Sequence, residues 1–269
     1  MLRKRAVIAL TLGSLALYLV YLGGWFYFIP ITAVLLLATY EFTNMMRKIG
    51  VSINLWLLLT AVFLLLLGNQ IPNWPANLLT LMSLMLFMSY SLWLYEKEES
   101  QTAVLSWMTM MGGFLFFGWV GNHFLLLRDI EVNAWQWTII ALISTWSADS
   151  GAYLIGRFMA GNILGRHPLA PRLSPNKTIE GYIGGIIFGS LFTVGTALLL
   201  QLPWLPALII GLLASIIGPL GDLGMSLIKR ESNVKDSGRI FGAHGGAIDR
   251  VDSLIWSVAM AYYVLFLFA

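Results

Sequence analysis

The feature that most constrains this chain is a series of nine apolar stretches, each about as long as a helix that crosses a lipid bilayer. A hydrocarbon core about 30 Å thick is crossed by a helix of about 20 residues. The stretches occupy most of the chain, so no independent water-soluble domain fits between them. The sequence therefore predicts an all-α, polytopic integral membrane protein with about nine transmembrane helices. These helices are expected near residues 6–23, 25–42, 53–69, 77–95, 102–121, 134–155, 180–201, 204–228 and 251–268.

The composition excludes a water-soluble globule. Hydrophobic residues make up 58% of the chain and charged residues only 11%, whereas charged residues make up about 25% of a typical soluble domain. So few polar side chains cannot cover a surface that faces water, and most of the surface must face lipid. The chain has no cysteine, which excludes disulfides, cysteine-ligated metals and a thiol nucleophile.

The distribution of lysine and arginine predicts the orientation in the membrane, because basic residues accumulate in cytoplasmic loops. With the N-terminus inside, all of the 16 basic residues except Arg128 fall on the inner side. We therefore expect a protein of the cytoplasmic (inner) membrane, with its N-terminus in the cytoplasm and its C-terminus outside. Its active site is expected to face the cytoplasm.

Polar residues concentrate in the second half of the chain. The segments 156–179 and 229–250 are long, contain glycine and proline, and are expected to be cytoplasmic loops of a catalytic region that spans 131–269. Residues 1–130 are expected to form a transmembrane scaffold with room for contacts between subunits. Within that scaffold, Glu41 and the charged run 96–99 are polar exceptions, and the run is interpreted as a solvated loop.

A first candidate group of functional residues lies at two predicted helix ends. Asp222, Ser226 and Lys229 stand at i, i+4 and i+7, which places a carboxylate, a hydroxyl and an ammonium on one helix face. Asp249 and Asp252 stand at i and i+3 at the start of the last span, where a helix N-terminus favours negative charge.

Between these ends lies the turn His244-Gly245-Gly246, whose glycines let backbone N–H groups approach a phosphate closely. Carboxylate oxygens, several cations and a glycine turn together are what a magnesium-bound polyphosphate requires. The role of His244 is left open among a ligand, a hydrogen-bond donor and a structural turn residue.

The segment from Ser226 to Asp252 resembles the motif of the phosphatidate cytidylyltransferases, also called CDP-diacylglycerol synthases. The motif has Ser, Lys-Arg, four residues, Lys-Asp, then His-Gly-Gly and Asp-Arg-x-Asp, and the spacing agrees over the segment. Ala247 departs from it, since a larger aliphatic residue is expected there. Residues 149–157 and 174–181 are similar to a second block of the family. The resemblance covers about 149–252, whereas residues 1–130 match only as apolar helices.

The resemblance implies that CTP reacts with phosphatidic acid in the bilayer to give CDP-diacylglycerol and pyrophosphate. It also implies a requirement for Mg²⁺, with room for a second cation, and a pairing of subunits into a homodimer. We expect no nucleic acid partner.

Candidate roles follow from the motif and from the positions of the charges. Asp222 and Asp249 are the first choice as metal ligands, because adjacent span ends could bring them together at the cytoplasmic boundary, and Asp149 and Asp252 are the second choice. The candidate catalytic residues are Asp222, Asp249, Lys229 and His244, and the candidate substrate-binding residues are Ser226, Arg230, Lys235, Arg239, Gly245, Gly246, Arg250, Lys177 and Arg157.

An internal repeat is a further hypothesis. Residues 149–157 and 222–230 share five of nine aligned positions, and each segment ends a span that runs from outside to inside. A true repeat predicts that Asp149 and Asp222 face one another across a shared cleft.

Two other functions remain as alternatives. Acidic residues within apolar helices are also typical of ion-coupled transporters, although here they lie near cytoplasmic ends. A CTP-dependent kinase that phosphorylates a membrane alcohol would release CDP instead of pyrophosphate.

Overall fold

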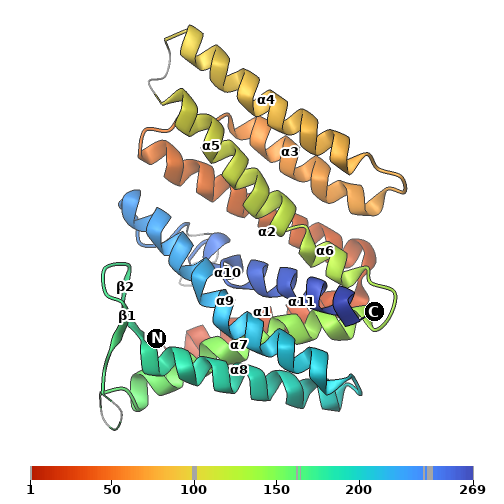
Figure 1. The fold of residues 1–269 in the computed structure, drawn as a ribbon, viewed down its shortest axis with the longest axis vertical. Coiled ribbons are helices and arrows are strands. Elements are labelled where there is room, and N and C mark those ends of the chain that lie inside the picture. Colours follow the sequence, from red (N-terminus) through yellow and green to blue (C-terminus); the bar gives the residue numbers. More distant parts are fainter. Residues whose placement is uncertain are drawn as a thin grey trace. The chain divides into compact units, whose positions relative to one another are not determined.

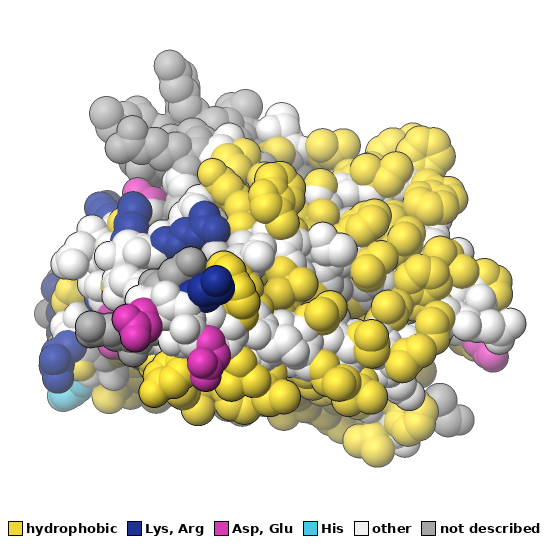
Figure 2. Space-filling view, turned by 90° about the horizontal axis from the view of Figure 1, so that it is seen from above, with side chains coloured by type: hydrophobic (Ala, Val, Ile, Leu, Met, Phe, Trp, Pro, Cys, Tyr) yellow, Lys and Arg dark blue, Asp and Glu magenta, His cyan; other side chains and the backbone are white. Residues whose placement is uncertain are grey.

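The structure is a computed structural model that describes residues 2–98, 102–161, 163, 165–238, 240 and 245–268, with the side chains of 2–10 excepted. Its architecture is helical (Figure 1), and each of the nine predicted apolar stretches coincides with helix in the described residues. Six helical segments of the described chain are long and apolar enough to cross a membrane: Gly24–Lys48, Ala76–Glu96, Ala103–Arg128, Ile179–Leu199, Trp204–Glu231 and Ile248–Phe268. Hydrophobic side chains cover much of the face shown in Figure 2. The protein is therefore an all-α membrane protein.

The chain folds into two compact units. Unit 1 comprises Met1–Gly23, Leu127–Leu227 and Arg250–Ala269, and unit 2 comprises Gly24–Leu126 and Ile228–Asp249. Residues 228–249, which include most of the proposed catalytic loop, thus belong to the same unit as residues 24–126.

Unit 2 is built on α2 (Gly24–Lys48), α3 (Leu55–Leu67), the short η1 (Gly68–Gln70), α4 (Ala76–Glu96) and α5 (Ala103–Gly113). Helix α3 begins where the Asn54 side chain accepts the Leu57 N–H at 3.1 Å. Aromatic side chains fill the core: Phe87 and Phe114 are fully buried, with ring centroids 5.8 Å apart in an edge-to-face arrangement. Such aromatic pairs add to the stabilisation from burial.

The fifth predicted span is longer than the sequence indicated. After α5 the chain continues through the π-helical η2 (Phe114–Val120) to α6 (His123–Arg128). Apolar spacing alone does not reveal a π-helical segment, because its hydrogen bonds differ from those of an α-helix by one residue.

Unit 1 contains α1 (Leu2–Leu22), α7 (Ala134–Phe158), α8 (Ile179–Leu199), most of α9 (Trp204–Glu231) and α11 (Leu254–Phe268). Helices α7 and α8 lie side by side (Figure 1) and approach closely through small residues. A Cβ at Gly151 would meet Phe188 and the Gly184 carbonyl, so only glycine fits there. Small residues at such contacts are typical of helices that pack in membranes.

A β-hairpin precedes α8, in the segment that the sequence predicted as a loop. Strands β1 (Pro168–Ala170) and β2 (Ser174–Thr178) pair antiparallel, with Pro168 opposite Thr178 and Ala170 opposite Ser174. Thr178 then caps α8, since its Oγ1 accepts the Gly181 N–H at 3.0 Å. The hairpin and the cap hold the end of β2 against the start of α8.

Two helices extend beyond their predicted ends. Helix α7 continues to Phe158 and α9 to Glu231, so Arg157, Lys229 and Arg230 lie on helices rather than in loops. Basic side chains in a last helical turn interact favourably with the helix dipole, which accounts for the extension.

The last predicted span is interrupted. It consists of α10 (Ile248–Val251) and α11, separated by a turn at Asp252 and Ser253. The Asp252 carboxylate accepts the Ser253 N–H at 2.8 Å, and such local bonds compete with helical ones. Asp249 therefore lies on α10 and Asp252 in the turn that follows it, and the shared face of these two residues stays a prediction.

We expect Gly185→Ala to destabilise the protein, because a Cβ there would lie 2.9 Å from the Ala148 carbonyl oxygen of α7. Forcing two backbones apart should cost about 1–3 kcal/mol. Gly195→Ala, also on α8, is the matched control, because a Cβ there meets nothing within 4 Å. Thermal unfolding in detergent should show a lower midpoint for Gly185→Ala alone, and equal midpoints would contradict the close packing of α7 on α8.

Candidate active site

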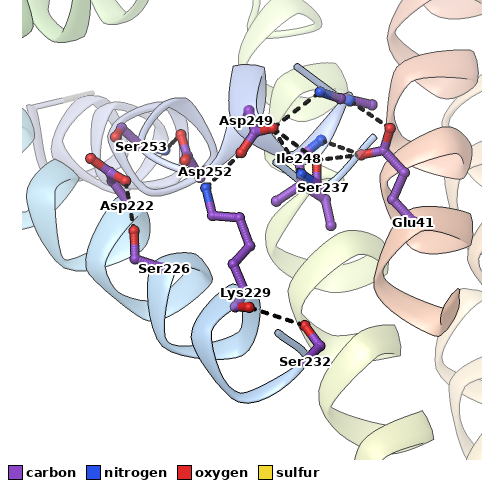
Figure 3. Close-up of polar contacts among 12 residues, drawn as sticks. Glu41, Asp222, Ser226, Lys229, Ser232, Ser237, Ile248, Asp249, Asp252 and Ser253 are labelled. Carbon is purple, nitrogen blue, oxygen red and sulfur yellow. Dashed lines mark hydrogen bonds and ion pairs between the residues drawn. The ribbon is translucent and has the colours of Figure 1, made fainter. Parts of the chain in front are cut away.

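The first polar cluster lies in unit 1 around Asp222. The Lys177 ammonium of β2 lies 2.5 Å from the Asp222 carboxylate of α9, and both side chains are about one-third exposed. On α9 itself, the Ser226 hydroxyl donates to Asp222 Oδ1 at 3.3 Å (Figure 3). The predicted common face of Asp222 and Ser226 is thus confirmed, while the cation that pairs with Asp222 comes from the hairpin.

Asp149 of α7 belongs to the same cluster. Its exposed carboxylate lies close enough to Asp222, Lys177 and Arg250 for their charges to interact. The charges of Asp149 and Asp222 thus interact, and a shared cleft and a common origin of 149–157 and 222–230 stay predictions. Two carboxylates near one another carry repulsion that a cation relieves.

The second polar cluster lies in unit 2 around Asp249. The Lys229 ammonium lies 2.6 Å from Asp249 Oδ1, and the side chains are only 12% and 10% exposed. The other oxygen, Oδ2, accepts the Gly246 N–H at 3.0 Å and the Ser237 N–H at 3.1 Å (Figure 3). The Ser237 hydroxyl lies 3.1 Å from Oδ2 and donates its one proton over a shorter distance to Glu41. Asp249 therefore fixes three separate parts of its unit: a helix end, a loop and the glycine turn.

The glycines of the turn are needed for this packing. Gly245 has φ +81°, a backbone conformation that favours glycine, and a Cβ there would press on the Asp249 carboxylate. A Cβ at Gly246 would collide with Glu41 and the Ser237 hydroxyl. The sequence explained these glycines by the approach of a phosphate, whereas the structure shows that carboxylates of the protein already lie against them.

Sequence reasoning missed Glu41 as a site residue. This carboxylate of α2 is 3% exposed and accepts the N–H groups of Ala247 at 3.0 Å and Ile248 at 3.1 Å. The Ser237 hydroxyl donates to it at 2.7 Å. The signal was present, since a lone acidic residue in an apolar helix is expensive to bury and is a functional candidate by default.

The other predicted residues occupy varied positions. Arg157 is exposed and its guanidinium packs over the rings of Tyr153 and Phe158. Arg230, Lys235 and Arg250 are exposed, whereas Asp252 is buried. Arg239 and His244 lie outside the described residues.

The donor atoms of the first cluster fit magnesium better than those of the second. Among the described residues, no group of three or more acidic or histidine side chains could hold a metal alone. Magnesium commonly needs only one or two carboxylates, with substrate phosphates and water completing its ligands. Asp149 and Asp222 supply such a pair once Lys177 turns away from Asp222, whereas Asp249 has Lys229 on one oxygen and two backbone N–H groups on the other.

Comparison with known proteins decides the family. A model of the cytidylyltransferase family matches residues 3–268. The chain belongs to this family.

Relatives of similar length support the assignment. The phosphatidate cytidylyltransferase of Bacillus subtilis is 31% identical over 272 residues, which cover 99% of this chain and 98% of the relative. That of Synechocystis is 30% identical over 290 residues, covering 97% and 96%, and that of Brucella suis is 31% identical over 280 residues, covering 100% and 94%. The protein is accordingly an enzyme of the nucleotidyltransferase class, and the similarity extends over the N-terminal helices that the motif left unmatched.

We expect the two lysines to differ in their effect on stability. Lys229→Met leaves the nearly buried Asp249 carboxylate without its ammonium, which should cost about 3–5 kcal/mol of unfolding free energy. Lys177→Met breaks a more exposed pair and should cost about 0–1 kcal/mol. Unfolding in detergent without substrates measures both variants.

The double variant Lys229→Met, Asp249→Asn removes the uncompensated charge and should recover part of the loss. Equal destabilisation by Lys177→Met and Lys229→Met would contradict the difference in burial between the two ion pairs.

Proposed function

We propose that the protein transfers the cytidylyl group of CTP to phosphatidic acid, giving CDP-diacylglycerol and pyrophosphate for phospholipid synthesis. The observation that carries the proposal is the match of nearly the whole chain to the cytidylyltransferase family and to relatives named phosphatidate cytidylyltransferase. The two lysine–aspartate pairs add a chemical reason. Their ammonium groups are held in place by carboxylates, and both substrates carry phosphate groups that such ammonium groups bind.

One bond forms and one breaks in the reaction. An oxygen of the lipid phosphate attacks the α-phosphorus of CTP, and the bond from that phosphorus to the β-phosphate oxygen breaks, so that pyrophosphate leaves with the electron pair. Phosphatidic acid is already an anion near neutral pH and needs no strong general base. The enzyme's tasks are therefore to align two anions and to neutralise their charge.

Lys177 and Lys229 suit these tasks because a carboxylate positions the ammonium group of each lysine. In the structure their ammonium groups neutralise Asp222 and Asp249. A phosphate oxygen accepts the same charge-assisted hydrogen bond as a carboxylate oxygen, so each lysine can turn from its aspartate toward a bound substrate.

Other residues of the motif complete the proposed substrate site. Exposed cations would attract CTP and the lipid headgroup, and the hydroxyl of Ser226 and the glycine turn would add neutral donors. The role of His244 stays open among a ligand, a hydrogen-bond donor and a structural turn residue. The residues assigned to substrates are Lys177, Ser226, Arg230, Lys235, Arg239, Gly245, Gly246, Arg250 and Arg157.

Magnesium is the proposed cofactor, with room for a second cation. The sequence put Asp222 and Asp249 first as ligands and Asp149 and Asp252 second, and the contacts within unit 1 favour Asp149 as the partner of Asp222. When bound, the ion would polarise phosphoryl oxygens and offset charge on the leaving pyrophosphate. The carboxylates would hold it, and the lysines that they release would remain beside the substrates.

The membrane arrangement is part of the proposal. Nine transmembrane segments, a cytoplasmic N-terminus and an outer C-terminus account for the distribution of basic residues. In this arrangement the enzyme lies in the cytoplasmic membrane, takes CTP from the cytoplasm and takes phosphatidic acid from the bilayer. Residues 1–130 would serve as scaffold and as the contact surface of a homodimer, and residues 131–269 would carry most of the catalytic groups.

Incubation of the purified protein with labelled CTP, phosphatidic acid and Mg²⁺ tests the function. We expect equal amounts of pyrophosphate and CDP-diacylglycerol, and Asp222→Asn prepared in parallel should lose at least about 100-fold in rate, because a charge that binds the metal is removed. Release of CDP would contradict the proposal in favour of a lipid kinase. An absence of turnover in the wild-type protein would leave transport as the competing function.

A further inference from the structure

The buried carboxylate of Glu41 has no role in the transfer described so far. It lies on α2, in the half of the sequence that was expected to act as scaffold. Burying a carboxylate costs free energy unless hydrogen bonds replace its water. At 3% exposure, Glu41 must obtain that compensation from the protein.

Within the described part of the chain, Glu41 accepts three hydrogen bonds from a segment made of residues 237–238 and 245–249. Oε1 accepts the Ala247 N–H, and Oε2 accepts both the Ile248 N–H and the Ser237 hydroxyl. The donors are separated from Glu41 by about 200 positions in sequence, and all belong to the same compact unit. The carboxylate therefore joins two parts of that segment to α2.

The same network reaches Asp249 through Ser237. The Ser237 hydroxyl lies 2.7 Å from Glu41 Oε2 and 3.1 Å from Asp249 Oδ2 (Figure 3), and the Ser237 N–H is donated to that Oδ2. A displacement of Glu41 would thus release Ser237, one of the groups that orient Asp249.

The shape of the segment also matches Glu41. A Cβ at either Gly238 or Gly246 would collide with its carboxylate. The backbone therefore approaches the Glu41 carboxylate at two positions that have no side chain. Glycine at these two positions is explained by contact with Glu41.

We propose that Glu41 is a positioning residue for cytidylyl transfer, which fixes residues 237–238 and 245–249 so that Asp249, Gly245 and Gly246 are in place before substrate binds. The inference rests on the proposed function for its catalytic part. Glu41 acts through backbone N–H groups and Ser237, and it does not touch the reacting atoms. Helix α2, from the half of the sequence expected to be scaffold, then helps to position Asp249 and the residues beside it.

The two oxygens of a carboxylate make Glu41 hard to replace. Ala247 donates to one oxygen and Ile248 to the other. Glutamine has a single acceptor oxygen, and its NH₂ group would face the second backbone N–H. Aspartate keeps both acceptors and the charge, but is shorter by one methylene.

The experiment compares Glu41→Gln, Glu41→Asp and a control, Thr43→Val, in the full chain in detergent. Thr43 is also fully buried on α2, and its hydroxyl donates to the Thr39 carbonyl within the helix. Two quantities are measured: amide hydrogen exchange of the peptide 245–249, and kcat with the KM values for CTP and phosphatidic acid.

For Glu41→Gln we expect exchange in 245–249 to become at least about 10-fold faster, because two amides lose or weaken their acceptors. We expect kcat to fall about 10- to 100-fold with both KM values changed less than about twofold, as for residues that orient catalytic ligands. Glu41→Asp should recover part of kcat and of the protection. Thr43→Val should match the wild-type protein in both measurements.

Unchanged exchange in Glu41→Gln would overturn the inference whatever the activity. Faster exchange with an unchanged kcat would overturn the catalytic part. If Glu41→Gln fails to fold, Glu41→Asp decides the question. A fall in its kcat that parallels a loss of protection in 245–249 supports the inference, whereas an equal loss of protection in every peptide of that variant overturns it. A wild-type protein with protected amides and no turnover would instead overturn the proposed function.

Discussion

The structure of the site depends on one constraint: a carboxylate in a largely apolar helical protein must find its hydrogen-bond donors within the chain. Asp222 finds Lys177 and Ser226, and Asp249 finds Lys229, Ser237 and Gly246. These partners come from different segments, so satisfying the carboxylates also fixes the hairpin, the end of α9 and the glycine turn. The polar groups that we propose for the reaction are thereby held by hydrogen bonds and ion pairs within the chain.

We propose that the ion pairs also serve a substrate-bound state. An aspartate and a lysine neutralise one another without substrate, and both would become available when phosphate oxygens compete for the ammonium. The free-energy cost of this exchange should differ between the two pairs. Breaking the nearly buried Lys229–Asp249 pair should cost more than breaking the more exposed Lys177–Asp222 pair, because water compensates buried charges less. We infer that Lys177 exchanges its partner more readily than Lys229.

Much of the fold could be predicted, because long apolar stretches have few alternatives to helix in a bilayer. The details that escaped prediction arise from local competition for backbone groups. Asp252 interrupts the last span by bonding the Ser253 N–H, and the hairpin before α8 depends on strand pairing that apolar periodicity does not report. At the site, Asp222 and Ser226 were predictable from helix geometry. The Lys177–Asp222 pair and the Glu41 contacts join distant segments, and a single sequence gives no spacing rule for them.

The central claim is that an oxygen of the lipid phosphate attacks the α-phosphorus of CTP. The most direct test uses phosphatidic acid whose phosphate oxygens outside the ester linkage carry ¹⁸O, with mass spectrometry of both products. The account predicts that every labelled oxygen is retained in CDP-diacylglycerol and that pyrophosphate carries none. Loss of one labelled oxygen from the lipid product would show that the lipid phosphorus is attacked instead, and would contradict the account.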